Sequence, residues 1–218
     1  MFIGCSHSSS PPPVEDLTWK VPGTGSLYVD TYSRGTIALG QQGNSDASYS
    51  VKANGLFAGE SNTVTLVNTR NSNDKEYLAF ESNGDYSILD TSLGFSSNDW
   101  QRFPTGGGSP VLQSVDTLYF PDSIRFFDTL HVHKDFIRTY EGVENITDTS
   151  KVTYATFKIH QMTTEDDSVV SFQNPATPVI TTLNTYYWIA PTIGWIVKDS
   201  SCDDTNWTRK VLDGCTVY

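Results

Sequence analysis

The chain has 218 residues, of which 25 are acidic and 14 are basic, so its formal net charge is −11. A chain of this length buries a sizeable core, but its negative field, with no basic stripe to offset it, repels a phosphate backbone. Nucleic acid is therefore excluded as an expected partner. After the first few residues, no apolar run approaches the ~18–20 residues that a membrane-spanning helix needs.

Residues 1–16 are expected to lie outside the folded domain. Residues 6–16 read SHSSSPPPVED, a Ser/Pro-rich composition that is typical of a tether. The preceding FIGC resembles the lipobox of bacterial lipoproteins, in which an apolar and a small residue precede an acylated cysteine. This resemblance implies that residues 1–5 are the remnant of a lipoprotein signal and that Cys5 carries an acyl anchor to the membrane.

From residue 17 to the C-terminus, the chain is expected to form one β-rich domain. Its 11 Phe, 11 Tyr and 5 Trp favour strands, and turn-forming residues separate short apolar runs that lack helical periodicity. We expect an all-β fold of about ten antiparallel strands in a strongly curved sheet, as a half-barrel, clam or barrel-like sandwich with few short helices. PTGGGSP at 104–110 is expected to be a mobile loop or a seam between two halves. Besides one hairpin, strands are predicted at residues 26–32, 35–40, 62–68, 123–142, 152–162, 168–174, 185–191, 193–200 and 206–212.

The clearest local unit is the hairpin EYLAFESNGDYSILD at 76–90. Its Asn-Gly pair can adopt positive φ at both residues, which predicts a two-residue type I′ turn. That turn places Leu78 opposite Leu89 and puts Tyr86 on the other face from Leu78. Both faces are then partly apolar, so we expect the hairpin to be covered on both sides.

The chain contains three cysteines, and two of them lie close together near its C-terminus. Cys202 and Cys215 flank DDTNWTRKVLDG, which is expected to be the closing hairpin of the domain. In an exported protein we predict a disulfide between them, closing a loop of roughly 14 residues and stabilising the fold by about 3 kcal/mol. The alternatives are two free thiols in a reducing compartment and a zinc pair, which the long spacing disfavours.

Three segments near the C-terminal end carry a family resemblance. They are TYEGVENIT at 139–147, TYATFKIHQM at 153–162 and YYWIAPTIGWIVKDS at 186–200. Together they resemble the YEGxE…TFKI…YWxAPxIGxVK region of a family of uncharacterised bacterial periplasmic lipoproteins, over residues ~122–200. The resemblance implies a lipid-anchored β-domain of a Gram-negative-type cell envelope, at the periplasmic face or the outer membrane. It implies no catalytic residue and no particular ligand.

His131 and His133 are the best candidates for metal ligands. Side chains alternate along a strand, so both imidazoles lie on one face, and His160 would supply a third ligand if the strand register allows. The opposite face, which includes Val132 and Phe136, is expected to be buried. Two histidines facing solvent are therefore favoured over a metal site, and no cofactor is predicted.

Aromatic residues near the C-terminal end are the remaining candidate site. Tyr186, Trp188 and Trp195 gather around Ala-Pro and glycine turns, and such clusters line sugar-binding faces or apolar cavities. The alternative is that they fill the core. The sequence contains neither a nucleophile elbow nor a phosphate loop, which indicates a protein that is not an enzyme.

These observations predict a lipid-anchored, non-enzymatic domain of the cell envelope that binds an apolar or glycan ligand. Two alternatives remain. One is a structural or protein-interaction module of the envelope. The other is a metal-dependent enzyme that uses His131 and His133.

Overall fold

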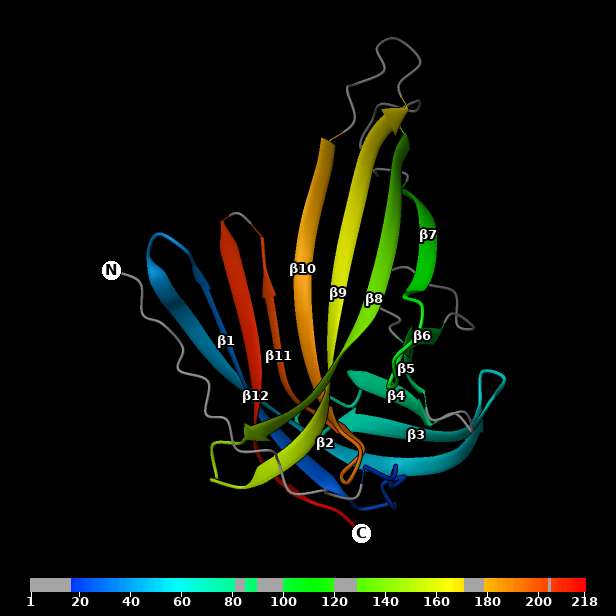
Figure 1. Ribbon diagram of the computed structural model, residues 1–218, viewed down its shortest axis with the longest axis vertical. Helices are drawn as coiled ribbons and strands as arrows, with labels where there is room; N and C mark the ends of the chain where they lie inside the picture. Colours follow the sequence, from blue (N-terminus) through cyan, green and yellow to red (C-terminus); the bar gives the residue numbers. More distant parts are fainter. Residues whose placement is uncertain (1–16, 81–84, 90–99, 120–128, 171–178, 204) are drawn as a thin grey trace.

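The described part of the chain forms a single antiparallel sheet. The computed structural model describes residues 17–80, 85–89, 100–119, 129–170, 179–203 and 205–218, and none of them is helical (Figure 1). They form twelve strands: β1 (Leu27–Thr36), β2 (Gly40–Phe57), β3 (Glu60–Asn68), β4 (Lys75–Phe80), β5 (Tyr86–Leu89), β6 (Trp100–Phe103), β7 (Val111–Tyr119), β8 (Thr129–Thr147), β9 (Thr153–Val170), β10 (Val179–Ala190), β11 (Trp195–Cys202) and β12 (Asn206–Thr216).

The strand order explains how this sheet curls. It runs β6-β5-β4-β3-β2-β1-β12-β11-β10-β9-β8-β7, so consecutive strands are neighbours except for β6 and β7, and the first strand pairs with the last. Residues 104–110 connect β6 to β7, the two outermost strands. Across the gap between these strands, Gln113 Nε2 donates a hydrogen bond of 3.3 Å to the carbonyl oxygen of Trp100. The sheet is therefore a nearly closed barrel, which confirms the predicted all-β, strongly curved antiparallel architecture.

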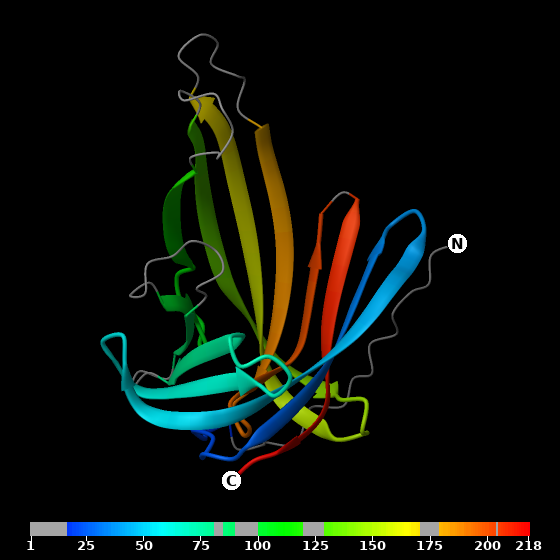
Figure 2. The ribbon, with the colours of Figure 1, turned by 180° about the vertical axis from the view of Figure 1, so that it is seen from behind.

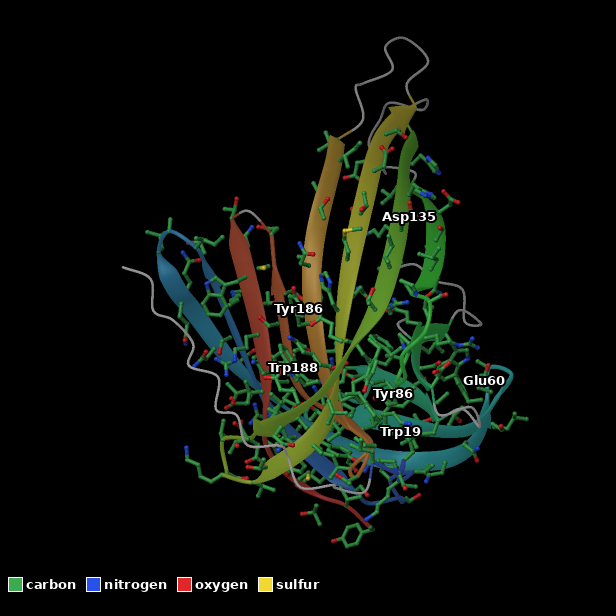
Figure 3. The ribbon with its side chains drawn as sticks, viewed as in Figure 1. Trp19, Glu60, Tyr86, Asp135, Tyr186 and Trp188 are labelled. Atoms are coloured by element: carbon green, nitrogen blue, oxygen red, sulfur yellow. The ribbon has the colours of Figure 1, made fainter. Side chains whose placement is uncertain are left out.

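One end of the barrel is packed, whereas β8, β9 and β10 extend well beyond the other strands at the opposite end (Figures 1 and 2). Residues 17–26 run along the packed end. There, Trp19 stacks on Tyr86 with ring centroids 5.2 Å apart and lies 5.6 Å from the rings of both Phe80 and Phe157. This N-terminal segment therefore closes the lower end with aromatic contacts (Figure 3).

The core is assembled from residues of eleven strands, all except β7, and of the β10–β11 turn. Its apolar members include large side chains that are almost fully buried, and such packing is the main favourable contribution to folding. They include Tyr28, Tyr49, Val51, Val64, Leu66, Leu78, Phe80, Tyr86, Phe103, Ile159, Ile189, Trp195, Val197 and Leu212.

One predicted strand is partly wrong, three strands were not predicted, and residues 123–128 and 171–174, also predicted as strand, lie outside the described residues. Residues 37–39, predicted as part of a strand, form the β1–β2 turn, where Ile37 and Leu39 are 64% and 76% exposed. The long strand β2 was not predicted because its sequence, GQQGNSDASYSVKANGLF, is mostly polar. It is held by backbone pairing with β1 on one side and β3 on the other. The short strands β6 and β7 were also missed.

The predicted hairpin forms as β4 and β5, but its register is shifted by one residue. Leu78 pairs with Ile88 rather than with Leu89, so Tyr86 lies on the same face as Leu78. A one-residue shift moves side chains to the other face because the side-chain period is two. Ala79 and Leu89 are buried on one face, and Leu78 and Tyr86 on the other, which confirms that both faces are covered. The predicted Asn-Gly turn lies outside the described residues.

Candidate functional site

A cavity of about 470 Å³ lies against the inner face of the barrel. Its lining comes from both halves of the chain, and it reaches the surface at the β3–β4 turn, where Asn73 and Lys75 are exposed. The inner lining combines aromatic rings, carboxyl groups, an amide and an amine: Tyr32, Phe103 and Tyr187, Glu76 and Asp199, Gln101, and Lys210.

One wall of the cavity is a row of directly paired residues, which we call the inner row. Lys210 of β12 pairs with Tyr32 of β1 on one side and with Asp199 of β11 on the other, and Asp199 pairs with Tyr187 of β10. Directly opposite residues in neighbouring strands point to the same face. The ladder therefore places an amine, a carboxyl group and two phenols side by side.

The positive charge of Lys210 is neutralised by a buried acid, Asp30. Its Nζ lies 3.6 Å from Asp30 Oδ2, and the two residues are only 3% and 0% exposed. Trp195 Nε1 donates to both oxygens of Asp30 at 3.2 Å. Burial lowers the pKa of Lys210, but the carboxylates around it, Asp30 foremost, raise that pKa well above its usual value. Lys210 therefore stays protonated and is paired with Asp30.

Two further acids, Glu76 and Asp199, face the cavity, and neither makes an ion pair with a basic side chain among the described residues. The pKa of Glu76 is raised to about 7, chiefly by burial; Lys210 lowers this pKa, and the nearby acids Asp30, Asp74 and Asp199 raise it. Burial also raises the pKa of Asp199, whose carboxylate accepts a hydrogen bond from the backbone of Lys210. Within the described residues, no hydrogen-bond donor reaches the Glu76 carboxyl group.

The opposite wall contributes a buried amide with an unused donor. Gln101 of β6 is 5% exposed, and its Nε2 has no hydrogen-bond partner among the described residues. The hydroxyl of Tyr86, which is 0% exposed, likewise has none. A buried polar group left unpaired costs about 1–3 kcal/mol. The negative charge of Glu76 raises the pKa of Tyr86, so these two groups interact electrostatically.

Gln101 is held in place by a buried arginine. Arg138 of β8 is 0% exposed and donates to the side-chain oxygens of Gln101, Gln113 and Gln161 at 2.7, 2.9 and 2.6 Å. Its guanidinium carbon also lies 4.9 Å from the centre of the Phe103 ring. Burial lowers the pKa of Arg138 to about 10. Three neutral amides thus fix the guanidinium, and it fixes the orientation of Gln101.

Of the predicted aromatic site, Tyr186 and Trp188 lie together, with ring centroids 6.1 Å apart, whereas Trp195 lies on the other face of the sheet. Trp195 is fully buried inside the barrel and stacks on Tyr28 with ring centroids 4.7 Å apart. Alternation along β10 sends Tyr187 to the cavity and sends Tyr186 and Trp188 to the opposite face. The alternative interpretation, that such aromatics fill the core, fits Trp195.

Tyr186 and Trp188 instead belong to a cluster on the other face of the sheet, which we call the outer cluster: Glu144, Lys158, Tyr186, Trp188 and Lys198 (Figure 3). Trp188 Nε1 donates to Glu144 Oε2 at 3.0 Å, and Lys198 Nζ lies 4.0 Å from the centre of the Trp188 ring. Lys158 Nζ lies 3.9 Å from Glu144 Oε2 and 5.4 Å from the Tyr186 ring centre. The three segments that carry the family resemblance thus meet here, and their charged groups pair with one another.

The histidine pair lies on the predicted face. His131 and His133 are 34% and 37% exposed, whereas Val132 and Phe136 on the opposite face are buried. Both imidazoles contact Asp116 Oδ1, at 3.1 and 2.8 Å. The hydrogen bond to Asp116 raises the pKa of His133.

The proposed third ligand does not join them. His160 contacts Asn184 Oδ1 at 3.0 Å and stacks on Tyr186. Its backbone pairs with Thr139, eight residues along β8 from His131. Within the described ranges, no group of three or more His, Cys, Asp or Glu side chains is arranged to hold a metal ion.

The predicted disulfide is not formed. Cys202 and Cys215 are both free thiols. Cys202 ends β11 and pairs with Trp207 at the start of β12, whereas Cys215 lies near the other end of β12 and pairs with Tyr28. Eight residues of extended strand separate Trp207 from Cys215, which at about 3.3 Å per residue is far beyond the reach of a disulfide. Cys5, the predicted lipidation site, lies outside the described residues.

Sequence reasoning missed the cavity residues, although one signal for them was present. In TRKVL of β12, Lys210 alternates with neighbours that face outward and shares its face with the buried Leu212. A lysine at an inward position of a strand indicates a buried ion pair, because an unpaired charge is too costly to bury.

Comparison of the chain with protein-family models, curated proteins and solved structures found no match. Across the described residues, there is no helix of the length and apolar character needed to cross a bilayer. The resemblance to periplasmic lipoproteins stays a prediction.

Proposed function

We propose that the protein is a non-enzymatic binding module that holds a small molecule in the cavity between the inner row and the wall formed by β4, β5 and β6. The cavity volume of about 470 Å³ lies within the ~300–1,000 Å³ range of small-molecule sites. The observation that carries the proposal is the Gln101 amide, which is buried at the cavity wall with an unused donor.

The lining favours a polar ligand with an apolar face. Phe103 and Tyr187, whose ring centroids lie 4.9 Å apart, offer aromatic surface of the kind that packs against sugar rings and other flat molecules. Glu76 and Gln101 offer an acceptor and a donor. A purely apolar ligand would leave both unpaired at about 1–3 kcal/mol each. Of the two ligand classes predicted from sequence, the glycan-like class therefore fits the lining better than the apolar one.

A cavity-filling variant tests this proposal. In Ile88→Trp, the new ring occupies the space beside Glu76 and Gln101, and Leu112→Trp, at an exposed position of β7, serves as the matched control. Small amines, sugars and apolar compounds are screened by ligand-observed NMR. We expect binders that Ile88→Trp abolishes and Leu112→Trp retains. Binding that survives in Ile88→Trp, or a screen without any binder, would contradict the proposal.

The proposed location is the cell envelope, where Cys5 carries an acyl anchor and residues 6–16 act as the tether. Support comes from the FIGC motif, the Ser/Pro-rich segment that follows it and the resemblance of residues ~122–200 to periplasmic lipoproteins. Mass spectrometry of protein extracted from membranes, expressed from the gene with its upstream region, tests the anchor, with Cys5→Ser as the control. We expect an acyl-modified Cys5 in the unaltered protein, and an unmodified Cys5 would rule the anchor out.

A further inference from the structure

We infer that the cavity selects a small organic cation, an ammonium-bearing molecule whose charge is met by Glu76 and Asp199 and whose apolar part lies against the aromatic wall. This inference rests on the proposed function and names the class of ligand that the cavity takes.

The first argument is the balance of charge around the cavity. Asp30, Glu76 and Asp199 place three carboxyl groups around one buried amine, Lys210. The only ion pair that this amine makes among the described residues is with Asp30, at 3.6 Å. Glu76 and Asp199 therefore remain as uncompensated acids on the cavity wall, and a bound cation would supply the missing charge.

The other basic side chains nearby do not supply that charge. Lys75 lines the mouth of the cavity, but it is exposed at the start of β4. Arg138 lies behind Gln101, where it donates to three glutamine oxygens. Neither of these two groups therefore neutralises Glu76 or Asp199.

The second argument is independent of the acids and concerns the aromatic wall and the amide. Tyr32, Phe103 and Tyr187 line the cavity, and an aromatic face within about 6 Å attracts an ammonium group through its quadrupole. One ring of this wall already lies near an ammonium group, because Lys210 Nζ lies 5.9 Å from the centre of the Tyr32 ring.

Gln101 would contact the part of the ligand that lies away from its ammonium group. Its side chain lines the cavity and is nine-tenths buried or more, its oxygen accepts from Arg138 at 2.7 Å, and its buried Nε2 has no hydrogen-bond partner among the described residues. A hydroxyl or carbonyl oxygen of the ligand would satisfy this donor. An anion would also satisfy it, but would meet Glu76 and Asp199 in the same cavity and be repelled.

A charge-matched series of probes tests the inference: benzylamine, benzyl alcohol and benzoate share one aromatic ring and differ in charge. Each is titrated by isothermal calorimetry at pH 8, where Glu76 is ionised, into the unaltered protein, Glu76→Gln and Glu60→Gln. Glu60 begins β3, is not part of the cavity lining and serves as the matched control (Figure 3).

We expect benzylamine to bind at least tenfold more tightly than benzyl alcohol, and benzoate not to bind. Glu76→Gln should weaken benzylamine at least tenfold, and Glu60→Gln should change it less than twofold. If benzyl alcohol or benzoate binds in the cavity as tightly as benzylamine, or if Glu76→Gln has no effect, the cation inference is overturned while the binding function stands. If no probe binds and the NMR screen also finds no cavity ligand, both are overturned. Melting temperatures of Glu76→Gln and Glu60→Gln that are no lower than that of the unaltered protein, measured by circular dichroism, show that a loss of folding does not explain weaker binding.

Discussion

The inner row and the outer cluster share strands β10 and β11 and contain similar residue types, yet they differ in how their polar groups are paired. Each combines aromatic rings, lysine and acid, but the inner row adds residues of β1 and β12, whereas the outer cluster adds residues of β8 and β9. In the outer cluster, Trp188 donates to Glu144 and the two lysines lie near that acid or over aromatic rings. In the inner row, Lys210 pairs with Asp30, whereas Asp199 of the row and the nearby Glu76 of β4 face a cavity. A set of polar groups that pair with one another indicates a scaffold, whereas one that leaves groups unpaired indicates a binding site.

The largest expected effect on the free energy of unfolding follows from removing the inner lysine, Lys210. Lys210→Met leaves Asp30 buried without its counter-charge, and breaking a buried pair in this way costs about 3–5 kcal/mol. Lys158→Met, the matched change in the outer cluster, removes a partly exposed amine and should cost less than about 1 kcal/mol. Urea unfolding measures both. Equal losses for the two variants would remove the distinction between the regions.

The next largest expected effect is a pH dependence of the stability that arises from the inner acid Glu76. The pKa of Glu76 is about 7 in the folded protein, above its ordinary value of 4.5, so between these values Glu76 binds more protons in the folded state than in the unfolded state. The contribution of Glu76 to stability therefore falls as pH rises from 4.5 to 7. The groups that face Glu76 are Lys210 of β12, Asp30 of β1, Asp199 of β11, Asp74 before β4 and Tyr86 of β5.

Glu76→Gln removes the contribution of this one group. At pH 8 the variant should be about 3 kcal/mol more stable than the unaltered protein, and at pH 4 the difference should vanish. The other raised acids, Asp30 and Asp199, act in both proteins and cancel in the comparison. Guanidinium unfolding curves at the two pH values provide the measurement. A difference that does not depend on pH would show that Glu76 ionises normally.

The two tryptophans give a smaller contrast. Trp195→Phe removes a donor to the buried Asp30 and should cost about 1.5–3 kcal/mol, as hydrogen bonds to charged groups do. Trp188→Phe removes a donor to Glu144, whose side chain is 48% exposed, and should cost less than about 1 kcal/mol. The free energy of unfolding decides the order, and a larger loss for Trp188→Phe would contradict the account.

The smallest expected effect concerns the thiols, measured in Cys5→Ser protein without reductant. Cys202 is exposed, whereas Cys215 is half-buried with a pKa raised by burial. Iodoacetamide should therefore label Cys202 first and Cys215 slowly. In urea, both should be labelled. A denatured chain that takes up no label would show the disulfide that the structure lacks.

Local pattern predicted much of the fold but little of the site. Alternation on β8 correctly placed Val132 and Phe136 inside and His131 outside. The polar strand β2 escaped prediction because backbone pairing with β1 and β3, rather than apolar side chains, holds it. The disulfide prediction failed because proximity in sequence becomes distance along an extended strand.

The cavity could not be read from the sequence, because its walls meet only when the barrel closes. Glu76 and Gln101 lie on β4 and β6, and Asp199 and Lys210 on β11 and β12, more than 90 residues later along the chain. No local pattern brings them together. The unused donor of Gln101 likewise depends on Arg138, which reaches it from β8.

The most direct test of the binding account is a crystal structure of the protein grown with benzylamine. The account predicts that the ammonium nitrogen lies within hydrogen-bonding distance of the Glu76 carboxylate and that the ring lies against Phe103 and Tyr187. An empty cavity at saturating benzylamine, or a ligand bound only at the outer cluster, would contradict it.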